Sequence, residues 1–108
     1  MNISKEDAIA HLAKWFDAGK RVRATYKTIA GNSSIVGKIT ELSAAAIKVA
    51  GGDSEMMFHF RATSEYDYKD VRQPQSEDGK NRDSKYPTVI DVKFTNGERL
   101  DIREFFED

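Results

Sequence analysis

Apolar residues recur at every second position in four successive stretches between residues 20 and 61. In the first stretch, Val22, Ala24 and Tyr26 alternate with polar and basic residues, which is the pattern of a β-strand that buries one face. The pattern therefore predicts four short strands in succession, joined as an antiparallel meander. The other three strands are marked by Ile35, Gly37 and Ile39, by Ala45, Ile47 and Val49, and by Met56, Phe58 and Phe60.

Glycines between and within these stretches predict how the meander turns and bends. Ala30–Ser33 and Gly51–Asp53 contain the small and polar residues that favour turns. Gly37 lies in the middle of the second stretch, where a residue without a side chain allows a sharp bend or the close approach of another backbone. We therefore expect a mostly β fold, built around a small, strongly bent antiparallel β-barrel.

The chain opens with a segment of helical period, from about Lys5 to Ala18. Ser4 can accept a hydrogen bond from a backbone N–H of the first turn, and Gly19 is a natural end of the helix. We expect its apolar stripe to pack on the protein's own core, with docking of a partner as the alternative. Trp15 is predicted to lie off the centre of the stripe and to contact a partner or a ligand. The stripe consists of Ile9, Leu12, Ala13 and Phe16.

A further strong pattern spans residues 88–103 and predicts a C-terminal β-hairpin in addition to the barrel. A two-residue turn at Asn96–Gly97 would place apolar side chains opposite charged ones. We therefore predict a three-residue loop, Thr95–Gly97, with Gly97 in the left-handed conformation of a bulge. The resulting register pairs Phe94 with Glu98, Val92 with Leu100, and Ile90 with Ile102.

Polar segments lie on both sides of this hairpin. Residues 73–85 are almost entirely polar or charged, and we expect a loop that is mobile or becomes ordered only on assembly. After the hairpin, Phe105 and Phe106 stand in an acidic tail. We expect these two aromatic residues to cover the barrel, with contact to a partner as the alternative.

The composition is that of one globular domain. The 108 residues are 39% hydrophobic and 32% charged, which suits a single packed core. The absence of cysteine excludes disulfides and thiolate metal sites, and two histidines alone do not make a metal site. Residues 1–48 carry eight basic and four acidic side chains, whereas residues 49–108 carry nine and fourteen. Such polarity suits either attraction of a nucleic acid or association of opposite faces of two copies.

The N-terminal segment does not resemble a secretory leader. Lys5, Glu6 and Asp7 stand where a leader needs an apolar run, and no stretch approaches the ~18 apolar residues of a membrane span. We therefore expect a cytoplasmic protein without a membrane partner.

The predicted helix followed by bent strands, with Gly37 and Ile39 in the second strand, resembles the Sm-like fold family and most closely its Hfq-like RNA chaperones. The likeness extends without gaps over about residues 25–64, where Ile47 and Val49 match aliphatic positions of the family. It implies a barrel of the Sm-like or SH3-like type. It also implies edge-to-edge pairing of subunits into a homo-oligomer, in the form of a ring.

The RNA-binding positions of the family are mostly not matched. Ser43, Ala44 and Ala45 take the places of an Asp, a Gln and a base-stacking Phe. The segment Phe58–Phe60 replaces a Tyr-Lys-His run, so Phe58 alone keeps an aromatic face on which a base can stack.

We therefore predict a non-enzymatic Sm-like interaction or structural protein that forms homo-oligomers, with single-stranded RNA as the alternative ligand. No cofactor, metal ligand or catalytic residue is predicted, because Asp67, Asp70 and His59 are close in sequence but show no nucleophile with a base and an orienting group. The candidate partner contacts are Trp15, Phe105 and Phe106. The candidate nucleic-acid contacts, which also fit the solvated face of an edge strand, are Lys20, Arg21, Arg23, Tyr26, Lys27, Phe58 and His59.

Overall fold

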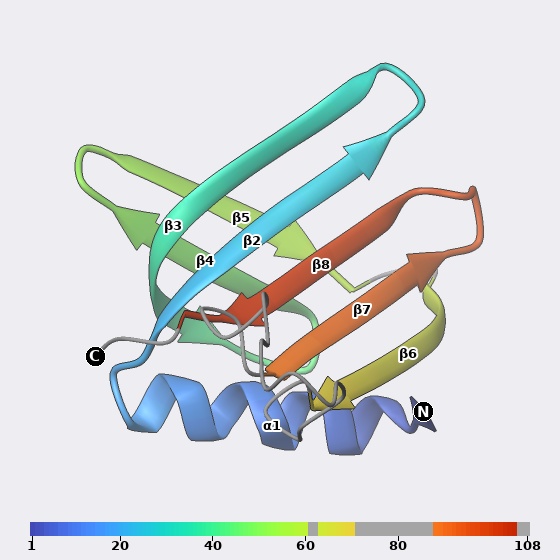
Figure 1. Ribbon diagram of the computed structural model, residues 1–108, viewed down its shortest axis with the longest axis horizontal. Coiled ribbons are helices and arrows are strands. Elements are labelled where there is room, and N and C mark those ends of the chain that lie inside the picture. Colours follow the sequence, from blue (N-terminus) through green and yellow to red (C-terminus); the bar gives the residue numbers. More distant parts are fainter. Residues whose placement is uncertain (61–62, 71–87, 106–108) are drawn as a thin grey trace, which may run out of the picture.

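The computed structural model describes residues 1–60, 63–70 and 88–105, and within them a helix lies against one strongly bent antiparallel sheet (Figure 1). The sheet order is β1-β6-β7-β8-β2-β3-β4-β5. The elements are β1 (Asn2–Ile3), α1 (Lys5–Asp17), β2 (Arg21–Thr28), β3 (Gly31–Leu42), β4 (Ala46–Gly51), β5 (Ser54–His59), β6 (Thr63–Asp70), β7 (Thr88–Phe94) and β8 (Arg99–Glu104).

The sheet is open, with β1 and β5 as its edges, so the predicted closed barrel is not confirmed. After β5 the chain enters β6, which pairs with β1 and β7 and not with β5. The four-strand meander itself is confirmed, because β2, β3, β4 and β5 are antiparallel neighbours in chain order. Figure 1 shows β4 and β5 passing behind β2, which makes one face of the sheet concave.

The bend of the meander follows from the close crossing of β3 and β4. A Cβ atom on Gly37 would lie against the Ala50 carbonyl oxygen and 2.8 Å from the Gly51 Cα. Glycine is therefore required there by the approach of a backbone, as the sequence predicts. A register shift between Ile39 and Glu41 adds to the bend.

The first turn of the meander lies earlier than predicted. Thr28 pairs with Gly31, so the loop is Ile29–Ala30 and β3 already begins at Gly31. The Thr28 side chain stabilises this turn, since its hydroxyl donates to the Gly31 carbonyl oxygen at 3.0 Å and accepts from the Ala30 N–H at 3.2 Å. The next turn, at Gly51–Asp53, is confirmed, with Gly52 at a φ of 60°.

The C-terminal hairpin has the predicted register. Ile90 pairs with Ile102 and Val92 with Leu100, and the Phe94 N–H donates to the Glu98 carbonyl oxygen at 2.9 Å. Gly97 has a φ of 92°, which is the left-handed conformation expected of it. The hairpin is not an appendage to a separate barrel, because β8 pairs with β2 and continues the same sheet.

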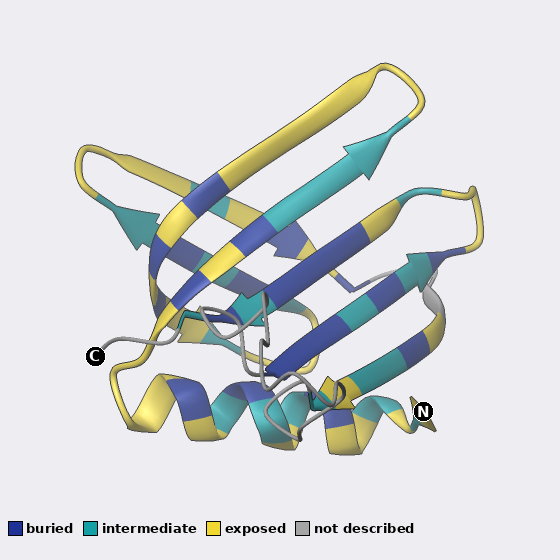
Figure 2. Ribbon diagram, in the orientation of Figure 1, coloured by how far each residue is buried: buried dark blue, intermediate teal, exposed yellow. Residues whose placement is uncertain are grey.

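The helix has the predicted bounds within one residue and the predicted cap, since the Ser4 hydroxyl accepts from the Asp7 N–H at 3.1 Å. The predicted orientation of its stripe is wrong. Trp15 lies in the core with 7% of its surface exposed, and Phe16 is exposed. Ala8, Leu12 and Trp15 have the spacing of one helical face, and this face meets the sheet (Figure 2).

The core fills the concave side of the sheet. Its fully buried members come from α1, from the inward face of β2, β4, β7 and β8, and from the end of β5, and Figure 2 shows buried residues running along β7 and β8. No helix among the described residues is both long and apolar enough to cross a membrane. The largest fully buried side chains are Phe60, Leu12, Ile47, Ile90, Leu100, Ile102, Val22, Val49 and Val92.

Candidate functional site

A cleft of about 410 Å³ opens beside the edge strand β5, and we call it the aromatic cleft. Its volume is at the small end of the range of about 300–1,000 Å³ that is common for ligand pockets. Three parts of the sheet converge on it: β5, the strands β2 and β3, and the β7–β8 hairpin. Its lining residues are Met56, Met57, Phe58 and His59 of β5, Tyr26 and Ser33 of β2 and β3, and Phe94, Thr95, Asn96 and Glu98 of the hairpin.

Tyr26 is the central aromatic ring of the cleft. Its ring lies 5.9 Å from that of Phe58, nearly parallel to it, and 5.7 Å from that of Phe94, at a tilt of 39°. Phe58 and Phe94 are themselves almost fully buried, whereas Tyr26 is half-buried. The cleft therefore has an aromatic wall that is held in place by the core.

Glu98 supplies the negative charge of the cleft. The Tyr26 hydroxyl donates a hydrogen bond of 2.5 Å to Glu98 Oε1. This bond, and a second one with the Asn96 side chain, lower the pKa of the Glu98 carboxyl below its ordinary value. Asn96 also accepts from the Glu98 N–H at 3.0 Å, which fixes the backbone there. Glu98 is therefore a stable carboxylate at neutral pH.

Local sequence explains why these groups meet. Paired residues of an antiparallel hairpin point to the same face, so the three-residue loop that pairs Phe94 with Glu98 directs both side chains to the cleft. Tyr26 follows Val22 and Ala24 on the inward face of β2. The alternation and the loop length are both visible in the sequence, whereas the approach of β5 to the hairpin is not.

The nucleic-acid contacts predicted from the sequence do not form one surface. Tyr26, Phe58 and His59 meet at the aromatic cleft. Arg23 and Lys27 project from β2 on the opposite, outer face, because successive strand residues alternate between faces. Whether either set binds nucleic acid stays a prediction.

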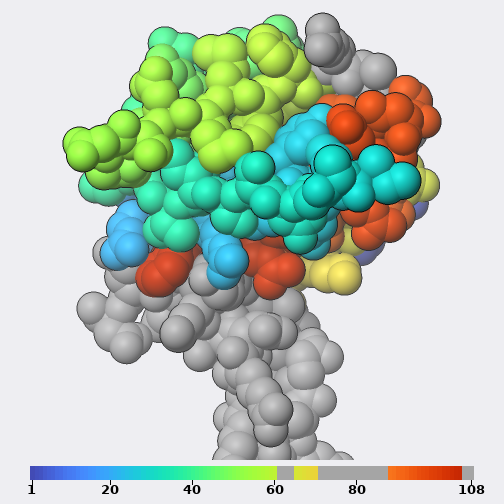
Figure 3. Space-filling model, turned by 90° about the horizontal axis from the view of Figure 1, so that it is seen from above, coloured from blue at the N-terminus to red at the C-terminus, as the bar shows by residue number. Residues whose placement is uncertain are grey.

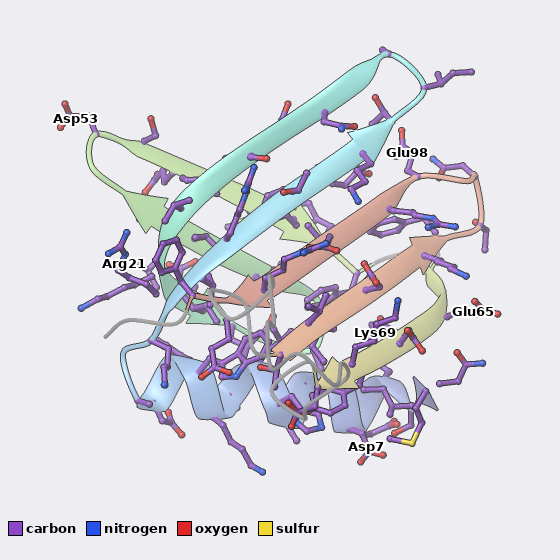
Figure 4. The ribbon with its side chains drawn as sticks, in the orientation of Figure 1. Asp7, Arg21, Asp53, Glu65, Lys69 and Glu98 are labelled. Carbon is purple, nitrogen blue, oxygen red and sulfur yellow. The ribbon has the colours of Figure 1, made fainter. Side chains whose placement is uncertain are left out.

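Two of the predicted basic residues make contacts at the beginning of β2. Lys20 Nζ lies 3.0 Å from Glu104 Oε1, and the buried Glu104 carboxylate also accepts from the Thr88 hydroxyl at 2.6 Å. The Arg21 guanidinium lies over the Phe105 ring, 4.5 Å from its centre. Figure 4 shows Arg21 and Glu98 at opposite ends of the β2–β8 pair.

The predicted partner contacts have different outcomes. Trp15 is buried in the core and has little surface left to offer a partner. Phe105 is half-buried beneath Arg21. Phe106 lies outside the described residues, as do residues 73–85. The alternatives for the acidic tail therefore stay predictions.

The outer face carries a feature that sequence reasoning missed, a row of three aspartates. Asp91 stands opposite Asp67 on β6 and opposite Asp101 on β8. Burial, a hydrogen bond with Asp101 and the charge of Asp101 raise the pKa of Asp91 to about 6. Asp101 is itself paired with Arg103 at 2.7 Å, and Asp67 with the N-terminal amine at 2.8 Å. This row is hard to predict from the sequence because each aspartate lies on a different strand.

The described residues contain no group of three or more histidine, cysteine or acidic side chains placed to hold a metal ion. Asp67, which is close to Asp70 and His59 in the sequence, is engaged with the N-terminal amine. His59 lies on the far edge strand of the sheet. Asp67 and Asp70 both lie on β6, whereas His59 lies on β5 at the other end of the sheet order.

Comparison with known proteins identifies no family for this chain. No protein-family model matches it, no curated protein matches it, and no solved structure matches its fold.

Proposed function

We propose that this chain is a non-enzymatic, Sm-like interaction protein that assembles with further copies of itself through the edge strand β5. The observation that carries the proposal is the open edge of β5, which bears the exposed side chain of Met57. The N-terminal helix and the four-strand meander with its close crossing at Gly37 support the Sm-like part of the proposal.

The backbone of β5 is arranged to pair with another strand. Hydrogen bonds in an antiparallel pair alternate along each strand. The Phe60 N–H donates to the Ala45 carbonyl oxygen at 2.9 Å. By alternation, the backbone N–H and C=O groups of Met56 and Phe58 also point toward β4. The N–H and C=O groups of Met57 therefore point away from β4, toward a side of β5 where no described strand pairs.

The side chains of β5 do not protect this edge. Sheet edges are commonly protected by proline, lysine or a bulge. Ser54–His59 contains no proline and no lysine, and its pairing with β4 is regular throughout. Met57 is 48% exposed, and Figure 3 shows the yellow-green surface of β5 exposed on the face seen from above. The opposite edge, β1, has two residues and offers much less backbone.

The mass in solution tests the proposal. Light scattering coupled to size exclusion should give a multiple of the 12.2 kDa chain mass for the unaltered protein. Met57→Pro removes an N–H that points outward, so it should shift the mass toward 12.2 kDa while leaving the β4–β5 ladder intact.

Met57→Thr is the matched control, because it removes the same side chain but keeps the N–H and a strand-favouring residue. It should keep more of the assembly than the proline variant. A mass of 12.2 kDa for the unaltered protein at high concentration would contradict the proposal, and so would an oligomer that Met57→Pro leaves unchanged.

Binding of single-stranded RNA is the second candidate, supported by the meeting of Tyr26, Phe58 and His59 at one cleft. The Glu98 carboxylate in that cleft would repel a phosphate group, so we rank RNA binding below self-assembly. Fluorescence anisotropy with labelled oligouridine tests it. Phosphate contacts require an affinity that falls steeply between low and physiological salt. The absence of binding at low salt would exclude this function.

A further inference from the structure

We propose that the aromatic cleft binds the side chain of an arginine carried by a partner protein. This inference goes beyond the proposed self-assembly, because it concerns a different protein as partner, at a cleft that borders the β5 edge. Met56 and Phe58 point to one face of β5 and Met57 and His59 to the other, yet all four line the cleft. Its mouth therefore lies at the edge of the sheet, where a partner can reach it.

The charge of the cleft selects a cation. Glu98 is held ionised by the hydrogen bonds from Tyr26 and Asn96. In the part of the chain that the structure describes, no lysine or arginine lines the cleft, and the ion pairs do not include Glu98. A ligand that brings a positive charge would therefore gain a carboxylate partner, whereas an anionic ligand would be repelled.

The walls of the cleft favour the guanidinium group among common cations. A guanidinium is planar, lies over aromatic faces and can donate two parallel hydrogen bonds to one carboxylate. Tyr26 provides an aromatic ring beside the Glu98 carboxylate, since its hydroxyl oxygen lies 2.5 Å from Glu98 Oε1. Met56 and Met57 provide adaptable apolar surface for the arginine stem. A lysine would bring the charge but neither the planar face nor the fork of donors.

Among the described residues, no arginine of a second copy is placed to enter the cleft, so the proposal assigns the arginine to a different protein. The described arginines are Arg21, Arg23, Arg99 and Arg103, and all lie within the central strands β2 and β8. A second copy could present them only as part of a broad sheet face, which does not fit a cleft of about 410 Å³. An extended segment of another protein can insert a single side chain.

Methyl NMR of methionine tests the proposal directly. The chain has three methionines, of which Met56 and Met57 line the cleft, while Met1 lies on the distant strand edge beside β1 with 76% exposure. The protein, labelled at the methionine methyl groups, is titrated with N-acetyl-arginine N-methylamide. The controls are the corresponding citrulline compound, which is neutral and nearly the same shape, and the lysine compound.

We expect saturable shifts of the Met56 and Met57 signals with the arginine compound and an unchanged Met1 signal. The citrulline compound should bind at least about tenfold more weakly, because it lacks the charge that the carboxylate and the ring attract. Glu98→Gln keeps an oxygen that can accept from Tyr26 and should abolish the preference for arginine. Fluorescence of the buried Trp15 verifies that this variant is folded.

Equal binding of the arginine and citrulline compounds would overturn the proposal, and so would equal or tighter binding of the lysine compound. Shifts at Met1 of the same size, or no saturable shift at all, would overturn it as well. The mass of the same sample separates the two proposals. An oligomer with an unresponsive cleft refutes arginine recognition alone, whereas a responsive monomer refutes self-assembly alone.

Discussion

Replacing Asp91 by asparagine should stabilise this protein at neutral pH and change its stability little in acid. Asp91 lies on the outer face opposite Asp101. Phe94 and Glu98 form a hydrogen-bonded pair, so by alternation Asp91 and Asp101 form a non-hydrogen-bonded pair, in which side chains lie closest. Burial and this close neighbour raise the pKa of Asp91 to about 6.

The magnitude follows from this pKa shift. The ordinary pKa of the group is 3.8, so the folded protein binds more protons than the unfolded chain between about pH 4 and 6. The raised pKa means that stability decreases as the pH rises through this window. A shift of about two pKa units corresponds to about 3 kcal/mol. Asp91 is only half-buried, so solvent screening reduces the expected cost to about 1 kcal/mol.

Urea unfolding at pH 4 and pH 8, followed by the fluorescence of Trp15, measures this effect. Trp15 is the single tryptophan and is buried, so its emission reports on the core. Asp91→Asn should raise the free energy of unfolding by about 1 kcal/mol at pH 8 and by much less at pH 4. Asp67→Asn is the control, because it removes a carboxylate from the same row but also an ion pair with the N-terminal amine. It should bring no gain. An equal gain of the Asp91 variant at both pH values, or a loss at pH 8, would refute the reasoning.

Three further substitutions test the fold, and each is measured by the urea midpoint against the unaltered protein. Gly37→Ala should destabilise by at least about 3 kcal/mol, because its Cβ would meet the Ala50 carbonyl oxygen; a smaller loss would mean that β3 and β4 can separate there. Ser4→Ala should cost about 1 kcal/mol through the lost helix cap, and an unchanged midpoint would contradict a role for this cap. Lys20→Met should cost about 1–2 kcal/mol, since it leaves the buried Glu104 carboxylate without its cation. If the Lys20 variant keeps full stability, the hydrogen bond from the Thr88 hydroxyl is by itself sufficient to stabilise the buried carboxylate.

Local patterns predict the elements of this fold well. The helix from Lys5, the four-strand meander and the register of the Thr95–Gly97 hairpin all depend on periodicity, capping and loop length within a few residues. The first turn was displaced because Thr28 closes it with its own side chain, a contact that composition does not indicate.

The candidate site was predictable only in part. Tyr26, Phe58 and His59 were singled out as potential contacts, and they do meet at one cleft. The sequence indicates Glu98 only as the partner of Phe94 in a hairpin. Its role in the cleft depends on the hydrogen bond from Tyr26, which lies 72 positions away in the chain.

The sequence by itself determined the helix, the four-strand meander and the C-terminal hairpin, because alternation and helical period are properties of neighbouring residues; β1 and β6 were not predicted. It also required glycine at Gly37 and Gly97, where a side chain is excluded by space or by the left-handed backbone. The tertiary structure alone decided that the sheet stays open, that the hairpin joins β2, and that Trp15 rather than Phe16 enters the core. Each of these outcomes depends on which distant strand pairs with which, and that choice is made by the total burial of the chain, not by any local segment of it.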